Sequence, residues 1–74
     1  MSRRFRIPRW VLFRVAARDG WRCHICVKAG FDGRYRPNDP WQIDHDVALA
    51  NGGTNHVKNL RLAHQSCNEG KGKA

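Results

Sequence analysis

The chain has 74 residues and a formal net charge of +8 at neutral pH. This length gives room for one domain, and so small a domain often needs a covalent or metal cross-link because it buries little of its surface. Seven arginines fall within the first 22 residues, opposed there only by Asp19, which indicates a polyanionic partner, either nucleic acid or an anionic membrane surface. No apolar run approaches the roughly 20 residues of a membrane span, and no secretory signal is recognisable, so nucleic acid is favoured.

The first expected element is a helix at about residues 8–19. Pro8 suits the first helical position, where its missing amide hydrogen is not needed, and Gly20 suits the C-terminal end. One face of this helix carries the apolar residues Val11, Leu12, Val15 and Ala16. The other face carries Trp10 and Phe13, which either wrap around a small core or contact DNA, the N-terminal arm or a second subunit.

The rest of the chain predicts short elements joined by turns. Residues 27–40 are rich in Gly, Pro, Asn and Asp, which indicates an irregular loop. Residues 41–45 alternate between apolar and polar as a strand does, residues 51–53 (Asn-Gly-Gly) indicate a turn, and residues 60–62 indicate a second short strand. A last helix is expected from about Gln65.

These elements predict a small α+β fold. We expect one domain at residues 8–74, preceded by a basic N-terminal arm at residues 1–7. The sequence shows no internal repeat and no second domain.

Three cysteines indicate a metal site in a reducing, cytoplasmic compartment, because an odd number without a signal peptide does not suit a disulfide framework. Cys23 and Cys26 form one pair with two intervening residues, and His64 and Cys67 form a second pair with the same spacing. Two such knuckles supply the four tetrahedral ligands of a structural zinc, with no position left open for catalysis. The ion would close a loop of 37 intervening residues and supply stability that the core lacks.

The fourth zinc ligand has two rivals. His24 lies between two ligating cysteines and would point away from the ion, whereas His56 has no cysteine at knuckle spacing. We therefore select His64. The alternative to zinc is that the cysteines are buried thiols and His64 is a surface histidine.

Asp44 and His45 have the chemistry for cutting a phosphodiester bond. A histidine can accept a proton from an attacking water at neutral pH, and a hard divalent ion on oxygen ligands can neutralise charge on the phosphate. Because the two residues are adjacent on an expected strand, their side chains would point to opposite faces unless the strand ends or kinks there.

Several motifs, in order along the chain, resemble the signature of the HNH endonuclease family. They are Asp44-His45, Asn51-Gly52-Gly53, Asn59-Leu60 and Cys67-Asn68-Glu69-Gly70-Lys71, and they follow Arg18-Asp19-Gly20-Trp21-Arg22-Cys23, which is similar to the usual lead-in to the first zinc knuckle. The resemblance covers roughly residues 8–72, nearly the whole chain.

The resemblance implies a ββα-metal fold, also called the His-Me finger, in which a hairpin and a helix hold a catalytic ion. His45 would be the general base that activates water, and Asp44 and Asn68 would bind the catalytic metal. Asn59 would hold the loop between the strands so that His45 stays oriented. The family's metal is commonly Mg²⁺ or Mn²⁺, with Ni²⁺ or Zn²⁺ active in some members, and the products would carry 5′-phosphate and 3′-hydroxyl ends.

Three residues depart from the family pattern. Asn68 stands in place of the final histidine, which suits a hard ion better than a soft one. His64 stands where many members have cysteine, which keeps the zinc but lowers the thiolate charge of the site. Asp46 follows His45 where an apolar residue is common, and it is either an additional metal ligand or a solvated carboxylate.

The implied substrate is double-stranded DNA, nicked or cut through, and the protein would act as a monomer or a dimer. Free-standing members of this size resemble nucleases of phages and prophages that assist genome packaging, which would make terminase and portal proteins partners. Restriction and mobile-element roles are also known for the family.

Basic side chains would bind DNA by contacting phosphates, which sets affinity but carries no sequence information. The candidates are Arg3, Arg4, Arg6, Arg9, Arg14, Arg18 and Lys71, with Arg34, Arg36 and Lys73 extending the path. The alternative is a solvated charged face. Two other functions stay open: a non-catalytic, zinc-stapled nucleic-acid-binding module, and a protein-interaction domain that uses Trp10 and Phe13.

Overall fold

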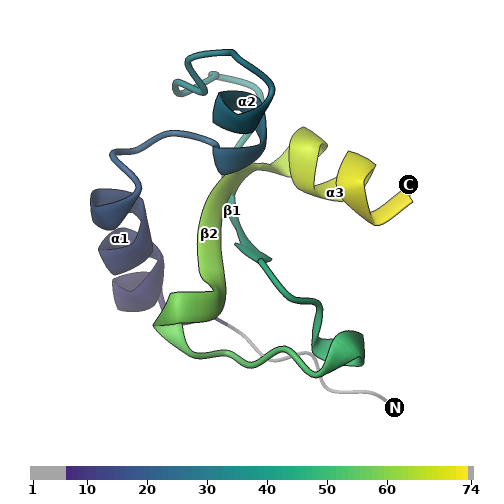
Figure 1. Ribbon diagram of the computed structural model, residues 1–74. Helices are drawn as coiled ribbons and strands as arrows, with labels where there is room; N and C mark the ends of the chain where they lie inside the picture. The colour runs from purple at the N-terminus through teal and green to yellow at the C-terminus, as the bar shows by residue number, and fades with distance from the viewer. Residues whose placement is uncertain (1–6, 74) are drawn as a thin grey trace.

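The computed structural model describes residues 7–73, and it describes side chains as far as residue 70. Three helices and two strands follow one another along the chain, with two short 3₁₀ turns between the strands (Figure 1). Their bounds are α1 Arg9–Arg18, α2 His24–Lys28, β1 Trp41–His45, β2 Leu60–His64 and α3 Gln65–Lys73, with the 3₁₀ turns at Leu49–Asn51 and Val57–Asn59.

Helix α1 lies within the predicted range, one residue shorter at each end. Pro8 precedes its first turn, and Gly20 follows its end with a φ of +67°, a left-handed conformation that glycine adopts without steric cost. The predicted apolar face is the buried one, since Val11, Val15 and Ala16 all lie in the core. On the other face Trp10 and Phe13 are exposed, and the Phe13 ring meets the edge of Trp21 with the ring centroids 5.7 Å apart.

The two strands form an antiparallel hairpin. Trp41 pairs with His64, Ile43 with Leu62, and His45 with Leu60. Strand β1 has the predicted bounds, whereas β2 is two residues longer than predicted because pairing continues to His64. The main core lies where α1 packs against β2, and its buried members are Val11, Val15, Ala16, Leu60 and Leu62.

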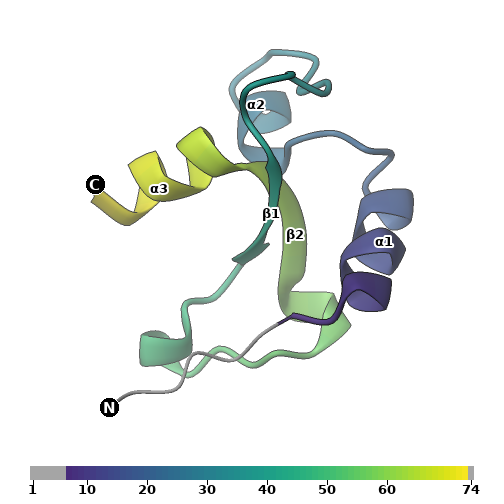
Figure 2. The ribbon, with the colours of Figure 1, turned by 180° about the vertical axis from the view of Figure 1, so that it is seen from behind.

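Helix α3 follows β2 without an intervening loop. Figures 1 and 2 show α1 and α3 on opposite sides of the hairpin, with α2 at one end of it. The Asp39 carboxylate anchors the start of α3, because it accepts hydrogen bonds from the Ser66 backbone N–H (2.9 Å) and hydroxyl (2.6 Å). These two bonds lower the pKa of the Asp39 carboxyl. The hairpin and α3 together make a ββα unit.

The connection between the strands is a long loop in which the backbone of Gly53 lies close to that of Val47. Asn51 and Gly52 lie at its first 3₁₀ turn, as the Asn-Gly-Gly motif indicated. A Cβ atom at Gly53 would lie 1.8 Å from the Val47 carbonyl oxygen, so only glycine fits at this position. Over residues 7–73, no helix has both the length and the apolar character needed to cross a membrane.

The region expected as an irregular loop, residues 27–40, is irregular apart from its first two residues, which complete α2. A helix of five residues leaves too short an apolar pattern to be recognised in the sequence. Gly33 in this loop approaches the first knuckle closely: its carbonyl accepts the Cys23 backbone N–H at 2.8 Å, and a Cβ on Gly33 would lie 2.8 Å from the Cys23 carbonyl oxygen.

Candidate functional site

Four metal-binding side chains gather where α2, the end of β2 and the start of α3 meet: Cys23, Cys26, His64 and Cys67. Their ligand atoms all lie within 4.8 Å of one another. Cys26 Sγ is 3.7 Å from Cys67 Sγ, and His64 Nδ1 is 3.4 Å from Cys26 Sγ. Tetrahedral zinc with ordinary bond lengths places two sulfur ligands about 3.8 Å apart, and a sulfur and a nitrogen about 3.6 Å apart. The group therefore fits a zinc site, with His64 as the fourth ligand and the rivals His24 and His56 outside it.

Surrounding contacts orient His64 for this role. Its Nε2–H donates to the Arg34 carbonyl oxygen at 2.7 Å, which leaves Nδ1, the atom facing the thiols, as the unprotonated nitrogen. The Trp41 ring stacks on the imidazole with centroids 5.0 Å apart and an interplanar angle of 10°. The Arg36 guanidinium lies 3.6 Å from Cys26 Sγ, where a cation stabilises thiolate charge.

The two thiols of the first knuckle differ in acidity. Burial, followed by the neighbouring thiols of Cys67 and Cys23, raises the pKa of Cys26 to about 12. Burial also acts against ionisation of Cys23, but hydrogen bonds to backbone groups outweigh it and lower the pKa of that thiol. A zinc ion must therefore displace a proton from Cys26 when it binds at neutral pH.

A second site lies beyond the end of β1, in a cavity of about 490 Å³. Its walls are formed by Ile43, Asp44, His45, Asp46, Ala48, Leu49, Asn51 and Asn68. The three side chains that the sequence assigned to catalysis and metal binding, Asp44, His45 and Asn68, thus face one cavity. The neighbours Asp44 and His45 can both line it because β1 ends at His45, where strict alternation between the faces of a strand stops.

His45 is held by a residue of the long loop. Its Nε2 lies 2.7 Å from Asn55 Oδ1. Because an amide oxygen can only accept, Nε2 carries the hydrogen, and Nδ1 is the basic nitrogen of the neutral ring. A histidine in this tautomer is suited to take a proton through Nδ1.

Asp44 and Asn68 are also oriented by neighbours. Asp44 is buried, and its Oδ2 accepts a 2.7 Å hydrogen bond from His24 Nε2. The Asn68 amide donates through Nδ2 to Gln42 Oε1 at 3.0 Å, which fixes the orientation of the amide plane. A carboxylate and an amide oxygen are donors that hard cations such as Mg²⁺ and Mn²⁺ prefer, so the residues present fit a divalent ion of that kind.

Asn59 fastens the long loop to itself with three hydrogen bonds. Its Oδ1 accepts from the Val47 backbone N–H at 2.8 Å, and its Nδ2 donates to the carbonyl oxygens of Val47 (3.0 Å) and Thr54 (2.7 Å). These contacts fix the segments that follow His45 and precede Asn55. Asn59 therefore acts on the loop that follows His45 and carries its partner Asn55, and it does not line the cavity.

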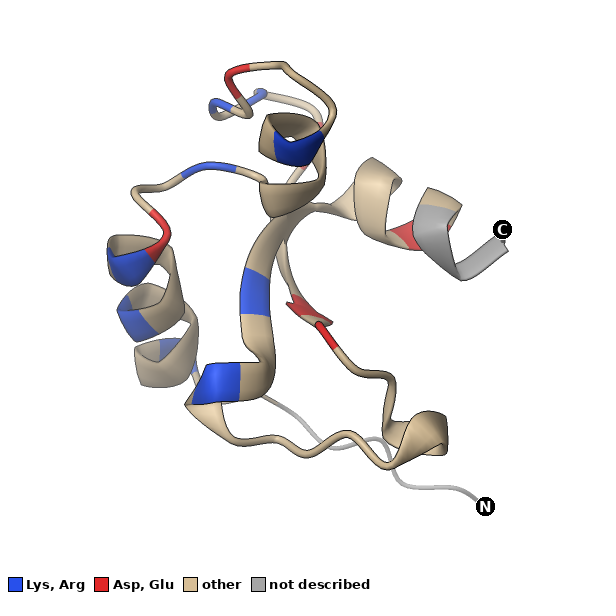
Figure 3. Ribbon diagram, viewed as in Figure 1, with Lys and Arg blue, Asp and Glu red and all other residues tan. Residues whose placement is uncertain are grey.

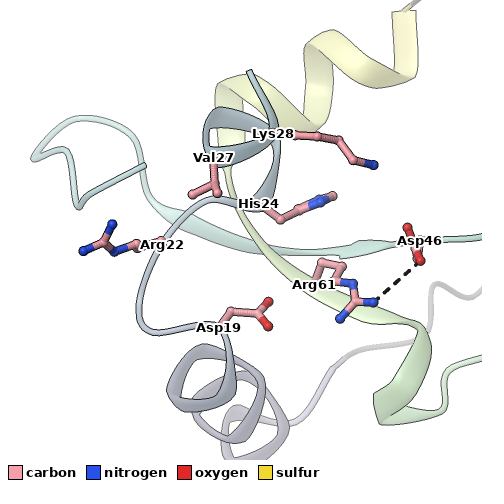
Figure 4. A pocket seen from close by; sticks show the side chains of 7 residues that line it. All are labelled: Asp19, Arg22, His24, Val27, Lys28, Asp46 and Arg61. Atoms are coloured by element: carbon pink, nitrogen blue, oxygen red, sulfur yellow. Dashed lines mark ion pairs between the residues drawn. The ribbon is translucent and has the colours of Figure 1, made fainter. Parts of the chain in front are cut away.

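Asp46 lies between this cavity and a second hollow of about 460 Å³ on the α1 side of the hairpin. Its half-exposed carboxylate forms an ion pair with Arg61 at 3.8 Å (Figure 4). The position of Asp46 at the cavity wall leaves both sequence interpretations open, an additional metal ligand or a solvated carboxylate.

The expected DNA-binding residues fall into three groups. Arg9 and Arg14 are exposed on α1, where Figure 3 shows basic residues along the helix. The Arg18 guanidinium instead contacts Asp19 and the backbone carbonyls of Val57 and Leu60, so it joins α1 to the end of the long loop. Arg3, Arg4, Arg6 and the side chain of Lys71 lie outside the described residues.

Two residues at the site were not assigned to it from the sequence. Asn55 lies in a loop rich in turn-forming residues, where an asparagine is ordinary. His24 was considered only as a zinc ligand and set aside because it lies between Cys23 and Cys26. That position, which turns it away from the zinc ligands, is what allows it to reach Asp44.

Comparison with known families agrees with this geometry. The model of the family described as HNH endonuclease matches residues 23–74, from the first zinc ligand through α3. The chain therefore belongs to the HNH endonuclease family, and its ββα unit beside a four-ligand group is the ββα-metal fold. Membership supports a nuclease-type function. No curated protein and no solved structure matches the chain.

Proposed function

We propose that this protein is a metal-dependent endonuclease that hydrolyses phosphodiester bonds of double-stranded DNA. The observation that carries the proposal is the cavity shared by Asp44, His45 and Asn68, beside a zinc site that has its full set of protein ligands. Family membership supports the reaction class. The net charge of +8 and the exposed Arg9 and Arg14 support a polyanionic substrate.

The chemistry divides among a few side chains. His45 accepts the proton of the attacking water through Nδ1, while Asn55 holds the ring by its Nε2–H. Asp44 and Asn68 would hold a divalent ion, Mg²⁺ or Mn²⁺, and that ion would supply charge neutralisation on the phosphate and on the departing oxygen. The zinc site keeps α2, β2 and α3 together and takes no part in the reaction.

The test is cleavage of supercoiled plasmid DNA in the presence of Mg²⁺ or Mn²⁺ by the wild type and the His45→Ala variant. We expect the loss of the base to lower the rate by about 100-fold or more, because general-base catalysis typically contributes 10²–10⁴-fold. DNA binding and zinc content should stay at wild-type levels.

The matched control is His56→Ala, which removes a histidine of the loop between the strands, one whose Nδ1 accepts the Lys58 backbone N–H. This variant should cleave within about threefold of the wild type, since His56 lies outside the cavity. Cleavage by His45→Ala at the wild-type rate would remove the proposed base. Tight DNA binding without cleavage by the wild type would favour the non-catalytic module.

A further inference from the structure

His24 occupies a position between the zinc knuckle and the cavity that holds the proposed catalytic residues. It is the first residue of α2 and lies between the zinc ligands Cys23 and Cys26. Its ring lines the hollow on the α1 side of the hairpin (Figure 4), while its Nε2 lies 2.7 Å from Asp44 Oδ2. Asp44 in turn lines the cavity beyond the end of β1.

The contact is partly buried. The side chain of His24 is 20% exposed and that of Asp44 is 8% exposed. A carboxylate removed from water in this way needs hydrogen-bond partners, and a short bond to a neighbouring imidazole N–H is a strong one. Because a carboxylate can only accept, His24 Nε2 is the donor.

This hydrogen bond restricts how Asp44 can present its carboxylate. One oxygen is tied to His24, so this hydrogen bond limits the side-chain rotamers and the carboxylate planes that Asp44 can adopt relative to α2. In metal sites, groups that hydrogen-bond to a ligand set its orientation, and their loss typically weakens metal affinity or activity 10–100-fold. The donor, His24, lies between the zinc ligands Cys23 and Cys26. The segment that binds zinc therefore also positions the donor to Asp44.

We propose that His24 is a positioning residue: it orients Asp44 for binding the catalytic divalent ion and thereby connects the zinc knuckle to the catalytic site. The proposal rests on the proposed function, because it takes Asp44 as a ligand of that ion. It assigns no proton transfer and no zinc ligation to His24.

The test measures Mn²⁺ binding to the zinc-loaded protein by the EPR signal of free Mn²⁺, which needs no catalytic turnover. His24→Leu replaces the imidazole with an apolar side chain and so removes the Nε2–H donor to Asp44. We expect this change to raise the Mn²⁺ dissociation constant at least about 10-fold. His24→Gln places an amide N–H₂ where it can reach Asp44, and it should return the constant to within about threefold of the wild type. The Mn²⁺ concentration for half-maximal plasmid cleavage should change in parallel.

His56→Leu is the matched control and should bind Mn²⁺ as the wild type does. Zinc content and melting temperature of each variant show whether it is folded. Should His24→Leu fail to fold, His24→Asn carries the same expectation, because its amide is too short to reach Asp44.

The proposal would be overturned if His24→Leu or His24→Asn were folded and bound Mn²⁺ with wild-type affinity. It would also be overturned if His24→Gln bound Mn²⁺ no more tightly than His24→Leu. A lowered melting temperature with unchanged Mn²⁺ affinity would assign His24 a purely structural role and would also overturn it. Failure of the wild type itself to bind Mn²⁺ or to cleave would instead contradict the proposed function.

Discussion

Hydrogen bonds from other segments orient the two side chains proposed for catalysis and metal binding, His45 and Asp44. His45 and Asp44 each have a short bond to a residue from another segment, Asn55 and His24 respectively. A base must have its acceptor nitrogen facing the water, and a metal ligand must keep its oxygen at a fixed place. The orienting residues should therefore affect the reaction without touching the substrate.

The Asn55→Ala variant tests whether Asn55 orients the proposed base, His45. Without the Asn55 oxygen, the acceptor that keeps the hydrogen on His45 Nε2 is lost, so fewer molecules present an unprotonated Nδ1. We expect kcat for plasmid cleavage to fall about 10-fold or more, with KM within about twofold of the wild type. Steady-state cleavage over a range of plasmid concentrations measures both, and an unchanged kcat would show that Asn55 does not orient the base.

The roles of these partners could not be read from the sequence, whereas the residues proposed for catalysis and metal binding are named by the family motifs. Asp44, His45 and Asn68 stand in motifs with family spacing. Asn55 and His24 are ordinary residue types in a turn and a knuckle, and their importance arises from contacts with residues 10 and 20 positions away. Such contacts depend on how the loop and α2 pack, which no local pattern encodes.

At the scale of elements, the start of α3 depends on hydrogen bonds to a residue outside the helix, Asp39. It starts directly after β2, and the Asp39 carboxylate from the preceding loop accepts from both the backbone and the hydroxyl of Ser66. Acceptors at a helix start satisfy backbone N–H groups that have no partner within the helix. The anchor also holds in place the turn that carries Cys67 and Asn68.

Asp39→Ala should lower the melting temperature of the zinc-loaded protein by a few degrees at pH 7, because α3 loses its N-terminal acceptor. The lowered pKa of Asp39 means that its contribution is full above the pKa of an unfolded aspartate, about 3.9, and is lost as the pH falls through the lower folded value. Thermal melts followed by circular dichroism check the change. Asp32→Ala, at an exposed aspartate of the same loop, is the control, and equal melting temperatures for the two variants would contradict the anchor.

The sequence predicts helices and strands most accurately where its apolar residues recur at a regular spacing. The apolar face of α1 and the alternation in β1 predict those elements to within a residue. The sequence does not predict the last two residues of β2. Ala63 and His64 continue the strand pairing opposite Gln42 and Trp41, and this pairing depends on the partner strand. Helix α2 is not predicted because its five residues are too few to show an apolar pattern in the sequence.

At the scale of the whole molecule, the proposed function separates a structural role, at the four-ligand zinc site, from a catalytic role, in the cavity beyond the end of β1. The four ligands of the zinc site come from the knuckle of Cys23 and Cys26, from the end of β2 and from α3, so zinc would join segments that lie far apart in the sequence. The core that α1 and β2 share contains five buried residues, which is little for a domain of this size. Stability should therefore depend on zinc, whereas cleavage should depend on a second ion.

The most direct measurement of this division is the metal content of the purified protein, combined with plasmid cleavage before and after Mg²⁺ or Mn²⁺ is added. We predict one zinc per chain, an unchanged far-ultraviolet circular dichroism spectrum in the presence or absence of the second metal, and cleavage only when that metal is supplied. A protein that carries zinc alone and cleaves at the same rate without any added divalent ion would contradict the account.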